Sequence, residues 1–588
     1  MTDAKTVRTT ALIRLAIGLI QGIALFLLQK ADESKAWPAT APMLYAPLLV
    51  CALMVPLLPL AALSAMRRMA LIAWTAIAAA LAAILAIHAA WTGAEPDRLG
   101  AGPLSPPLFI AVAALLFIAH HLIQPAEAAR RPVAPYADYF DLAWTHATRL
   151  FLALAFTGAF WLLLFLAGAL FKLIGVEAIQ KLIGETAFAF PATGLMFAAA
   201  VHMAEQLTHA RAGLVRGART VGLTLLAWLS PLMVLIAGGF LATLPFTGLA
   251  PLWGTKAATA LLLAAAAALI ILVNAAYQDG AEPPHLVPRL AARAAGLLLI
   301  PIVMLAAYAL WLRVNQYGLT PDRVLATAYL VVAIGFTLGY AIAAIRPGPW
   351  MKPLEPTNLI MAAVSVLLLI ALFTPIADPA RLSVASQVKR LETGKVTADK
   401  FDFQFLRFDS GRYGKDELAK LKTSSNTTVA KLAVKSLAQT EKRYAPVQRS
   451  DFTNLAIYPA GKALPKSFRD QDWSASADMA CLIAGTKCSA LITDVDGDGI
   501  DEVLLGGGGQ LEIFKEGADH VWRHTANATP DCETFNLEPQ LKAGAPHMSE
   551  PVERRDLIIG NRRLNIRPIP KACPGDEAKA AAIAAQSD

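Results

Sequence analysis

The sequence predicts an α-helical polytopic membrane bundle of about 11 transmembrane helices, followed by a small α+β domain. Hydrophobic residues make up 56% of the 588 residues and charged residues only 16%, which is more apolar than an ordinary soluble protein. Long apolar runs recur along the chain and stop near Ile376. About 210 residues of mixed composition follow, enough for a separate globular domain.

The predicted helices are apolar segments of about 18 to 25 residues, each long enough to cross a bilayer. They cover residues 11–29, 43–65, 69–91, 105–123, 149–171, 186–203, 220–243, 257–276, 295–312, 324–345 and 358–376. The first segment is longer than the core of a signal peptide, and residues 31–36 offer no small-residue cleavage site. We therefore expect it to be retained as a helix.

Basic residues fall mainly on alternate connections between these helices, and this pattern predicts the orientation. The basic connections carry Lys5, Arg8, Arg67, Arg68, Arg130, Arg131, Arg211, Arg216, Arg219, Arg289, Arg293, Arg346 and Lys352. Because cytoplasmic loops are enriched in lysine and arginine, these connections and the N-terminus are expected in the cytoplasm. An odd number of helices then places the C-terminal domain outside. The net charge of +8 has the same origin, and no basic patch interleaved with aromatic residues indicates nucleic-acid binding.

Several polar side chains fall within the apolar segments, where an ionisable group usually faces the bundle interior or a wet cavity. They are Arg14, Gln21, His88, His120, His121, His202, Glu205 and Asn274. The positions of His120, His121, His202 and Glu205 near predicted cytoplasmic ends favour solvated or snorkelling side chains. Alternatively, His202 and Glu205 share one helix face and could form a proton relay or half of a metal site.

Three shorter patterns predict local structure in the membrane region. Gly18 and Gly22 indicate close helix packing, more consistent with the bundle itself than with a dimer face. The aromatic residues between Tyr136 and Trp144 predict an interfacial helix. In the outer connection, Arg313 and Arg323 flank a helix stop and a helix start, and are candidate contacts for an anion. The alternative is a tight hairpin whose arginines snorkel or pair with Asp322.

The segments Arg14–Gly22, Tyr136–Trp144 and Arg313–Arg323 resemble bacterial inner-membrane proteins grouped as domain-of-unknown-function family 4153. The run from Ser383 to Gly414 is also similar to full-length members. The resemblance implies a multi-pass protein of the bacterial inner membrane. In that membrane, the orientation predicted from the basic connections and the odd helix count makes the N-terminus cytoplasmic and the C-terminal domain periplasmic. The resemblance implies no catalytic or binding residue.

Four regions are expected: a transmembrane domain (1–376), a periplasmic helical module (377–447), a β-rich domain (448–575) and a mobile tail (576–588). Helices are predicted over 381–392, 416–422 and 428–442 from apolar periodicity. Strands are predicted over 489–493 and 503–505, at 510–514 and 520–523, and on both sides of a Gly-Asn turn within 556–566.

An acidic loop lies between the first two of these strands and predicts a calcium site. Its ligands would be the carboxylates of Asp494, Asp496, Asp498 and Glu502 and the carbonyl of Ile500, a set of hard oxygens suited to Ca²⁺. Position twelve carries leucine in place of the EF-hand glutamate, and a strand follows, so the loop resembles that of FG-GAP repeats. The alternative is an Asx-rich hairpin turn without a metal.

Four of the five cysteines lie in the polar C-terminal part and are candidates for two disulfides. They are Cys481, Cys488, Cys532 and Cys573, while Cys51 lies alone in an apolar segment. An even number confined to this part predicts an oxidising compartment, although their pairing stays open. Reduced thiols in a cytosolic domain are the alternative.

The sequence contains no nucleophile elbow, phosphate-binding loop, dinucleotide fingerprint or zinc-protease helix. We therefore name no catalytic residue and favour a non-enzymatic envelope protein. In this hypothesis a calcium-stabilised periplasmic domain binds a protein partner or an envelope polymer, and the bundle contacts the lipid bilayer. The alternatives are a transporter of an anionic or lipid-linked solute and a membrane enzyme acting on an envelope precursor.

Overall fold

The computed structural model describes residues 4–93, 106–249, 251–252, 257–439, 452, 455–471, 473, 481, 488–506, 511–528, 557–559 and 562–564. The chain divides into two compact units, Met1–Thr440 and Glu441–Asp588. The expected mobile tail, 576–588, lies outside the described residues.

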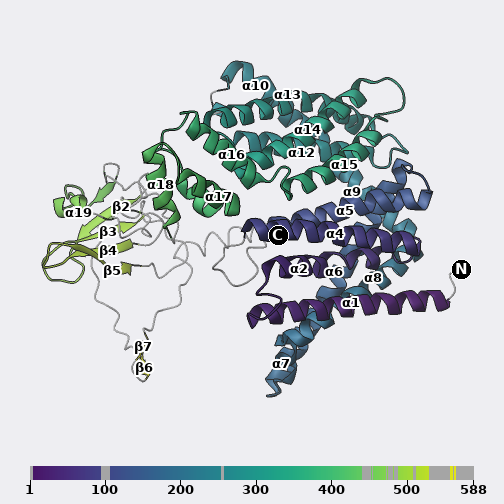
Figure 1. Ribbon diagram of the computed structural model, residues 1–588, viewed down its shortest axis with the longest axis horizontal. Helices are drawn as coiled ribbons and strands as arrows, with labels where there is room; N and C mark the ends of the chain where they lie inside the picture. The colour runs from purple at the N-terminus through teal and green to yellow at the C-terminus, as the bar shows by residue number, and fades with distance from the viewer. Residues whose placement is uncertain are drawn as a thin grey trace, which may run out of the picture. The chain divides into compact units, whose positions relative to one another are not determined.

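The first unit is a bundle of long helices that run side by side (Figure 1). In chain order these are α1 (Ala4–Glu33), α2 (Pro42–Met54), α3 (Leu57–Ala62), α4 (Arg68–Gly93), α5 (Pro106–Ala129), α6 (Tyr136–Leu173), α7 (Ala178–Gly184), α8 (Thr186–Ala210), α9 (Ala212–Ala227), α10 (Ser230–Thr247), α12 (Ala258–Tyr277), α13 (Leu286–Tyr317), α14 (Pro321–Ile345) and α15 (Leu354–Leu372). In the described part of the chain, eleven segments are long and apolar enough to cross a membrane, with α2–α3 and α9–α10 each counted as one. The predicted fold class and the eleven helices are confirmed.

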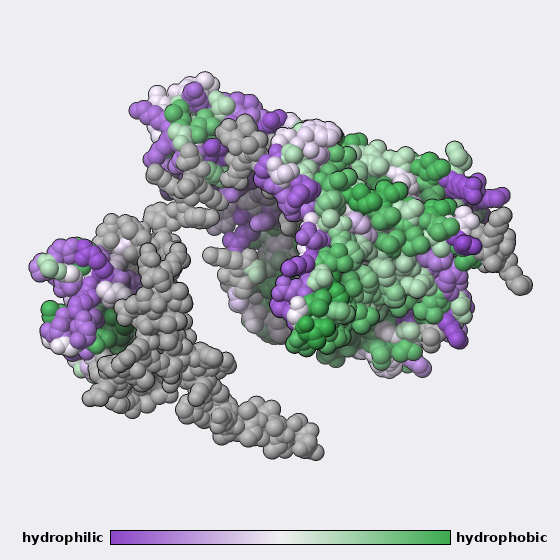
Figure 2. Space-filling view, turned by 90° about the horizontal axis from the view of Figure 1, so that it is seen from below, coloured by the Kyte–Doolittle hydropathy of each residue, from purple (hydrophilic) through white to green (hydrophobic). Residues whose placement is uncertain are grey.

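The surface of the bundle supports a membrane location. Hydrophobic residues form a broad belt over the helices, and hydrophilic residues gather at both ends of this belt (Figure 2). Many large apolar side chains on the helices are exposed, among them Leu162, Leu235 and Ile345. A soluble protein rarely exposes so extensive an apolar surface, whereas lipid covers it at no cost.

Two hydrophobic cores hold the bundle together. One forms among α2, α3, α4 and α5 around Trp74, Leu85 and Leu115. The other forms mainly among α12, α13 and α14 around Leu299 and Tyr340. Helix α15 packs against both α5 and α14, so it joins the two halves.

The pair of glycines in α1 allows an intramolecular helix crossing. A Cβ atom placed on Gly18 would lie 2.2 Å from the carbonyl oxygen of Gly194 in α8, and one on Gly22 would lie 2.4 Å from that of Phe190. Only glycine permits the two backbones to approach this closely. The expectation that these glycines serve bundle packing is confirmed.

The aromatic connection before α6 differs from its prediction. Tyr136 begins α6 and is continuous with the membrane segment, so these residues do not form a separate interfacial helix. Two of their side chains turn inward: the Tyr139 hydroxyl accepts a hydrogen bond from the Ala134 amide, and the Tyr136 hydroxyl accepts one from Asn358 Nδ2. Tyr139 is buried, Tyr136 is half-buried and Trp144 is exposed, so the segment turns only part of its aromatic side chains into the bundle.

Four shorter elements complete the first unit: α16 (Pro379–Glu392), the π-helix η1 (Phe405–Asp409), α17 (Gly411–Leu421) and α18 (Thr427–Leu437). Asp378 caps α16 by accepting a hydrogen bond from the Arg381 amide, and it also lies 2.9 Å from His88 Nε2 of α4. The Asn426 side chain caps α18. The three predicted helices are therefore present, although α18 ends at Leu437, and the π-helix was not predicted.

Helix α16 docks on the turn between α13 and α14. The Leu319 amide donates to Ser386 Oγ, and Gln387 Nε2 donates to the carbonyls of Tyr317 and Leu319. Gly318 has a φ of +74°, and a Cβ there would lie 2.6 Å from the Arg390 side chain. This turn therefore requires glycine both for its backbone conformation and for the docking of α16.

The second unit contains a five-stranded sheet, a short helix and a separate hairpin. Its elements are β1 (Ala456–Tyr458), α19 (Lys466–Asp470), β2 (Ser489–Thr493), β3 (Glu502–Gly506), β4 (Leu511–Glu516), β5 (Trp522–Ala528), β6 (Leu557–Ile559) and β7 (Arg562–Leu564). The sheet has the order β1-β2-β3-β4-β5, with β1 parallel to β2 and the other pairs antiparallel. All the predicted strands are present, and β1 was not predicted.

Side chains cover both faces of the central strands. On one face Ile492, Val503 and Phe514 pack against Phe468 of α19, and on the other Leu491 packs with Leu504. Because side chains of β2 and β3 are buried on both faces of the sheet, the register of this hairpin is specified, and the acidic loop that connects the two strands is held in place.

Candidate functional site

The acidic loop connects β2 to β3, and backbone hydrogen bonds hold it in shape. Asp494 accepts hydrogen bonds from the amides of Gly497 and Gly499, at 2.7 Å and 2.9 Å. Glu502 Oε2 accepts one from the Val495 amide at 2.7 Å. Gly497 and Gly499 have φ values of +77° and +82°, so the loop needs glycine at both positions.

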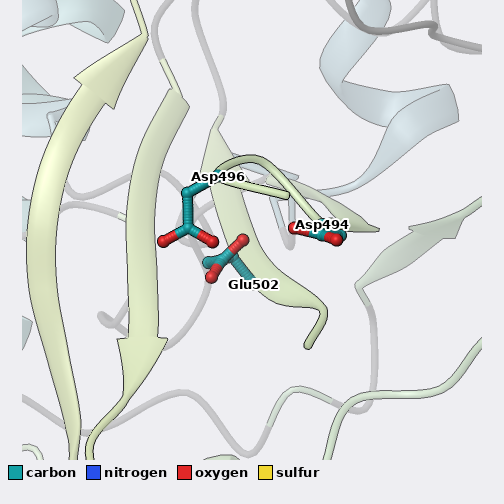
Figure 3. A group of neighbouring side chains, drawn as sticks. All are labelled: Asp494, Asp496 and Glu502. Atoms are coloured by element: carbon teal, nitrogen blue, oxygen red, sulfur yellow. The ribbon is translucent and has the colours of Figure 1, made fainter. Parts of the chain in front are cut away.

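Three of the predicted ligands converge. Carboxylate oxygens of Asp494, Asp496 and Glu502 all lie within 4.8 Å of one another, and Figure 3 shows the three side chains gathered beneath the loop. Glu502 is 2% exposed, whereas its two partners are more accessible. A buried carboxylate facing two others requires a compensating positive charge.

A lysine from the neighbouring strand supplies such a charge. Lys515 Nζ forms an ion pair with Asp496, lies 2.5 Å from Asp498 Oδ2 and lies 3.3 Å from Glu502 Oε1. The hydrogen bonds to Asp496 and Asp498 raise the pKa of Lys515, and the hydrogen bond from Lys515 lowers the pKa of Asp498. Asp498 thus faces Lys515, and Ile500 contributes its amide to Asp498 Oδ1.

Sequence reasoning missed Lys515. Because β3 and β4 pair with Val503 opposite Phe514, the next residues outward are Glu502 and Lys515, a cross-strand pair of opposite charge. The pairing of Glu502 with Lys515 can be predicted only when the register of β3 and β4 is known.

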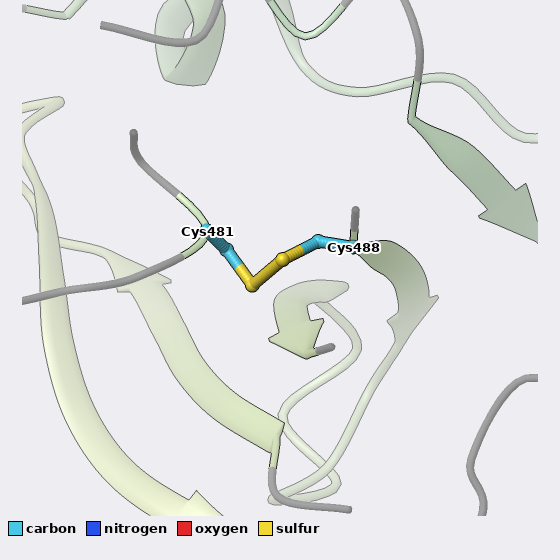
Figure 4. Close-up of a disulfide and its surroundings, with 2 residues drawn as sticks. All are labelled: Cys481 and Cys488. Carbon is cyan, nitrogen blue, oxygen red and sulfur yellow. A yellow bond between two sulfur atoms is a disulfide. The ribbon is translucent and has the colours of Figure 1, made fainter. Parts of the chain in front are cut away.

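One disulfide between the predicted cysteines is present, at the end of β2 opposite to the acidic loop. Cys481 and Cys488 are bonded, with their Cα atoms 5.8 Å apart, and Cys488 directly precedes β2 (Figure 4). Both cysteines are buried in the core beneath the sheet. Cys532 and Cys573 lie outside the described residues.

The two arginines of the outer connection line one groove. This groove has a volume of about 710 Å³, and Arg313, Asp322 and Arg323 contribute to its wall. Arg323 also donates to the Gly318 carbonyl at 2.6 Å and lies over the Tyr317 ring. The structure therefore brings the two candidate anion contacts together, with an acidic residue beside them.

The polar groups of the membrane segments are mostly buried and paired. Arg14 is fully buried and forms an ion pair with Glu205, while Gln21 donates to the carbonyls of Ala52 and Leu53. His120, His121 and Glu205 are only 3%, 8% and 3% exposed, so the expectation of solvated side chains is wrong for these residues. Their neighbours across the bundle exclude solvent, which a helix-by-helix view of the sequence does not reveal.

Asn274 belongs to a second polar cluster. It donates to the Tyr340 hydroxyl and accepts from Asn358 Nδ2, at 2.6 Å and 2.7 Å. The Tyr340 hydroxyl in turn donates to Asn358 Oδ1, and Asn358 reaches Tyr136. This closed network links α6, α12, α14 and α15.

The fold defines a multi-pass helical membrane protein with a small C-terminal sheet region. A family model described as "Domain of unknown function (DUF4153)" matches residues 48–421, and the chain belongs to this family. No curated protein and no solved structure matches the chain. The family membership predicted from the sequence is confirmed, and it assigns no activity.

Proposed function

We propose that the chain is a non-enzymatic envelope protein of the bacterial inner membrane, whose C-terminal unit lies in the periplasm and is stabilised by one calcium ion. The convergence of Asp494, Asp496 and Glu502 around a common centre carries this proposal. Asp498 and the Ile500 carbonyl belong to the same loop and would complete the ligand set. A periplasmic protein or an envelope polymer is the partner that such a rigid domain would bind.

Three independent features support the periplasmic location. Basic residues are concentrated on alternate connections, the described residues include an odd number of candidate membrane segments, as chain ends on opposite sides would require, and two cysteines are bonded. Calcium is abundant outside the cytoplasm, where sites of modest affinity are occupied.

Lys515 gives the competing explanation for the acidic loop. Its ammonium group contacts Asp496, Asp498 and Glu502, and could neutralise the loop permanently without a metal. In the calcium hypothesis this lysine would leave the carboxylates when the ion binds. The two explanations predict opposite effects for the Lys515→Met substitution.

Equilibrium dialysis of the full-length protein in detergent against radioactive calcium tests the proposal. We expect one ion per chain, loss of binding in Asp496→Asn/Asp498→Asn, and tighter binding in Lys515→Met because a competing cation is removed. Asp519→Asn is the control, since Asp519 pairs with Arg523 and is not one of the converging carboxylates. If the wild type binds no calcium and Lys515→Met is more sensitive to protease than the wild type, Lys515 is the permanent counter-charge of the acidic loop.

The groove beside Arg313 and Arg323 supports a second candidate function, the passage of an anionic solute. Its volume of about 710 Å³ is sufficient for a small organic anion. In this case Arg313→Gln would impair function at unchanged membrane abundance. Loss of abundance alone would assign the arginine to folding.

A further inference from the structure

A cavity inside the first unit gathers charged and imidazole side chains from four helices. It has a volume of about 230 Å³ and lies among α1, α5, α6 and α8. Its polar wall consists of Arg14, His120, His121, His146, Arg149 and Glu205. Sequence reasoning missed His146 and Arg149, because they follow the aromatic segment of α6 and were placed outside or at the edge of the predicted span.

Glu205 is the acidic residue among these six, and its two oxygens are already engaged. One oxygen pairs with Arg14 Nη1 and the other accepts a hydrogen bond from Ser64. Arg149 Nη1 lies farther away, 3.7 Å from Glu205 Oε1. Arg14 and Ser64 therefore already provide both oxygens of Glu205 with a hydrogen-bond partner, and Arg149 adds only a longer contact.

Arg149 leaves this cluster with an excess positive charge. Its Nε donates to Thr208 Oγ1 at 2.9 Å, and its Nη2 lies 3.0 Å from His209 Nε2, so neutral groups take up its nearest contacts. Two arginines and one carboxylate give the cluster a net charge of +1, and the Arg149 side chain is only 11% exposed. Because an uncompensated charge at such a position is costly, an anion bound in the cavity would stabilise it.

The three histidines present further unused polar atoms. The ring centroids of His120, His121 and His146 lie within 5.6 Å of one another, and Nε2 of each is buried without a hydrogen-bond partner among the residues that the structure describes. Trp74 donates to His120 Nδ1 at 3.2 Å, so the hydrogen-bond network assigns the proton of neutral His120 to Nε2. His120 thus offers a donor to an anion.

The same assignment argues against a three-histidine metal site. A neutral imidazole that accepts a hydrogen bond at Nδ1 carries its proton at Nε2 and has no lone pair there for a metal. His121 Nδ1 lies 2.7 Å from the Phe117 carbonyl, which makes Nδ1 the donor and leaves Nε2 as an acceptor. The cavity therefore offers donors and an acceptor together, a combination that matches a phosphate or carboxylate with a neighbouring hydroxyl.

The remainder of the cavity wall is apolar and reaches the surface of the bundle that faces lipid. Its other eleven lining residues are all apolar. Among them Phe117 and Leu150 are each 45% exposed and Leu57 is 38% exposed, so lining residues of α3, α5 and α6 also belong to the outer apolar surface of the bundle. A ligand that enters from this side comes from the bilayer.

We propose that this cavity binds the anionic headgroup of a membrane lipid, with Arg149 and His120 contacting the charged group and the apolar wall contacting the start of an acyl chain. A volume of about 230 Å³ accommodates a headgroup and a few methylene groups rather than a whole lipid. This site is independent of the calcium loop and of the proposed envelope function.

Binding of radiolabelled dioleoylphosphatidylglycerol to the delipidated full-length protein in dodecyl maltoside tests the proposal. We expect one tightly held lipid per chain, at least tenfold weaker binding in Arg149→Gln, and retention of binding in Arg149→Lys, which keeps the charge. Arg216→Gln is the matched control, because Arg216 is exposed on α9 and does not line the cavity. If Arg149→Gln is not monodisperse, His146→Gln replaces it, with weaker binding expected.

Three further probes decide between ligand classes. Zwitterionic dioleoylphosphatidylcholine and inorganic phosphate should each compete at least tenfold less well than the anionic lipid. Equal competition by phosphatidylcholine would show that only the acyl chain of the lipid is recognised. Equal competition by phosphate would show a site for a free anion. Either result would overturn the proposal. Binding of Zn²⁺ that His120→Gln and His121→Gln abolish would replace it with a metal site.

Discussion

The crossing of α1 and α8 allows the most direct test of how the bundle is held together, through the substitution Gly194→Ala. The new Cβ would lie 2.2 Å from the Gly18 carbonyl oxygen and 3.2 Å from the Gly22 amide nitrogen. These are backbone atoms, which cannot rotate away as a side chain would. The two helices must therefore separate by about 1 Å, and the packed side chains along the crossing lose contact.

The expected cost is about 1 to 3 kcal/mol, the range for adding one carbon atom to a tightly packed site. Gly158→Ala in α6 is the control, because a Cβ there meets nothing within 4 Å. At that position alanine should stabilise the helix by about 0.5 to 1 kcal/mol, since glycine is the poorer helix former. The two substitutions are chemically identical and should change stability in opposite directions.

The assay is unfolding of the purified protein by sodium dodecyl sulfate in mixed micelles, followed by circular dichroism. The difference in unfolding free energy between the two variants should be about 2 to 4 kcal/mol. If Gly194→Ala is as stable as Gly158→Ala, the two helices do not cross at these glycines in the membrane. That result would refute the packing argument for α1 and α8.

Two further predictions concern orientation and the polar network. A reporter enzyme active only in the periplasm should be active when fused after Asp588, and activity of a cytoplasm-specific reporter at the same point would reverse the assigned orientation. Asn358→Leu should lower the unfolding free energy by about 1 kcal/mol in the same detergent assay, because it leaves the buried polar groups of Asn274 and Tyr340 without one partner. Thr327→Leu is the control for this substitution, since the exposed Thr327 hydroxyl donates its hydrogen bond within its own helix. Equal losses of unfolding free energy in both variants would show that the network has no specific role in stability.

Local sequence patterns sufficed to predict the helices and most strands of the chain. Each membrane segment is predominantly apolar, and the β2–β3 hairpin has apolar runs on both sides of a glycine-containing acidic loop. Such features depend only on neighbouring residues. The helix over Tyr136–Trp144 was predicted, but its continuity with the membrane segment was not, and neither was the hydrogen bond that Tyr136 accepts from Asn358, 222 residues farther along the chain.

The candidate sites show the same division between local and distant information. The candidate ligands of the acidic loop are close together in the sequence and were predicted from it. Lys515 was not predicted, because it contacts the loop only through the pairing of β3 with β4. Arg14 and Glu205 were recognised as unusual residues in apolar segments, but their ion pair joins positions 191 residues apart. Their burial therefore could not be inferred from position along a single helix.

The two polar clusters in the bundle differ in a way that bears on function. In the cluster of Asn274, Tyr340 and Asn358, the side chains donate and accept among themselves, so the hydrogen bonds are used within the protein. Around Arg149, by contrast, three imidazole Nε2 atoms have no hydrogen-bond partner, and the fixed charges do not cancel. A cluster needed only for stability would gain from satisfying these groups, because each unpaired buried polar atom costs about 1 to 3 kcal/mol. The cavity beside them supplies the space in which a ligand can satisfy them, and for this reason we assign binding to the cluster around Arg149 and packing to the cluster around Asn274.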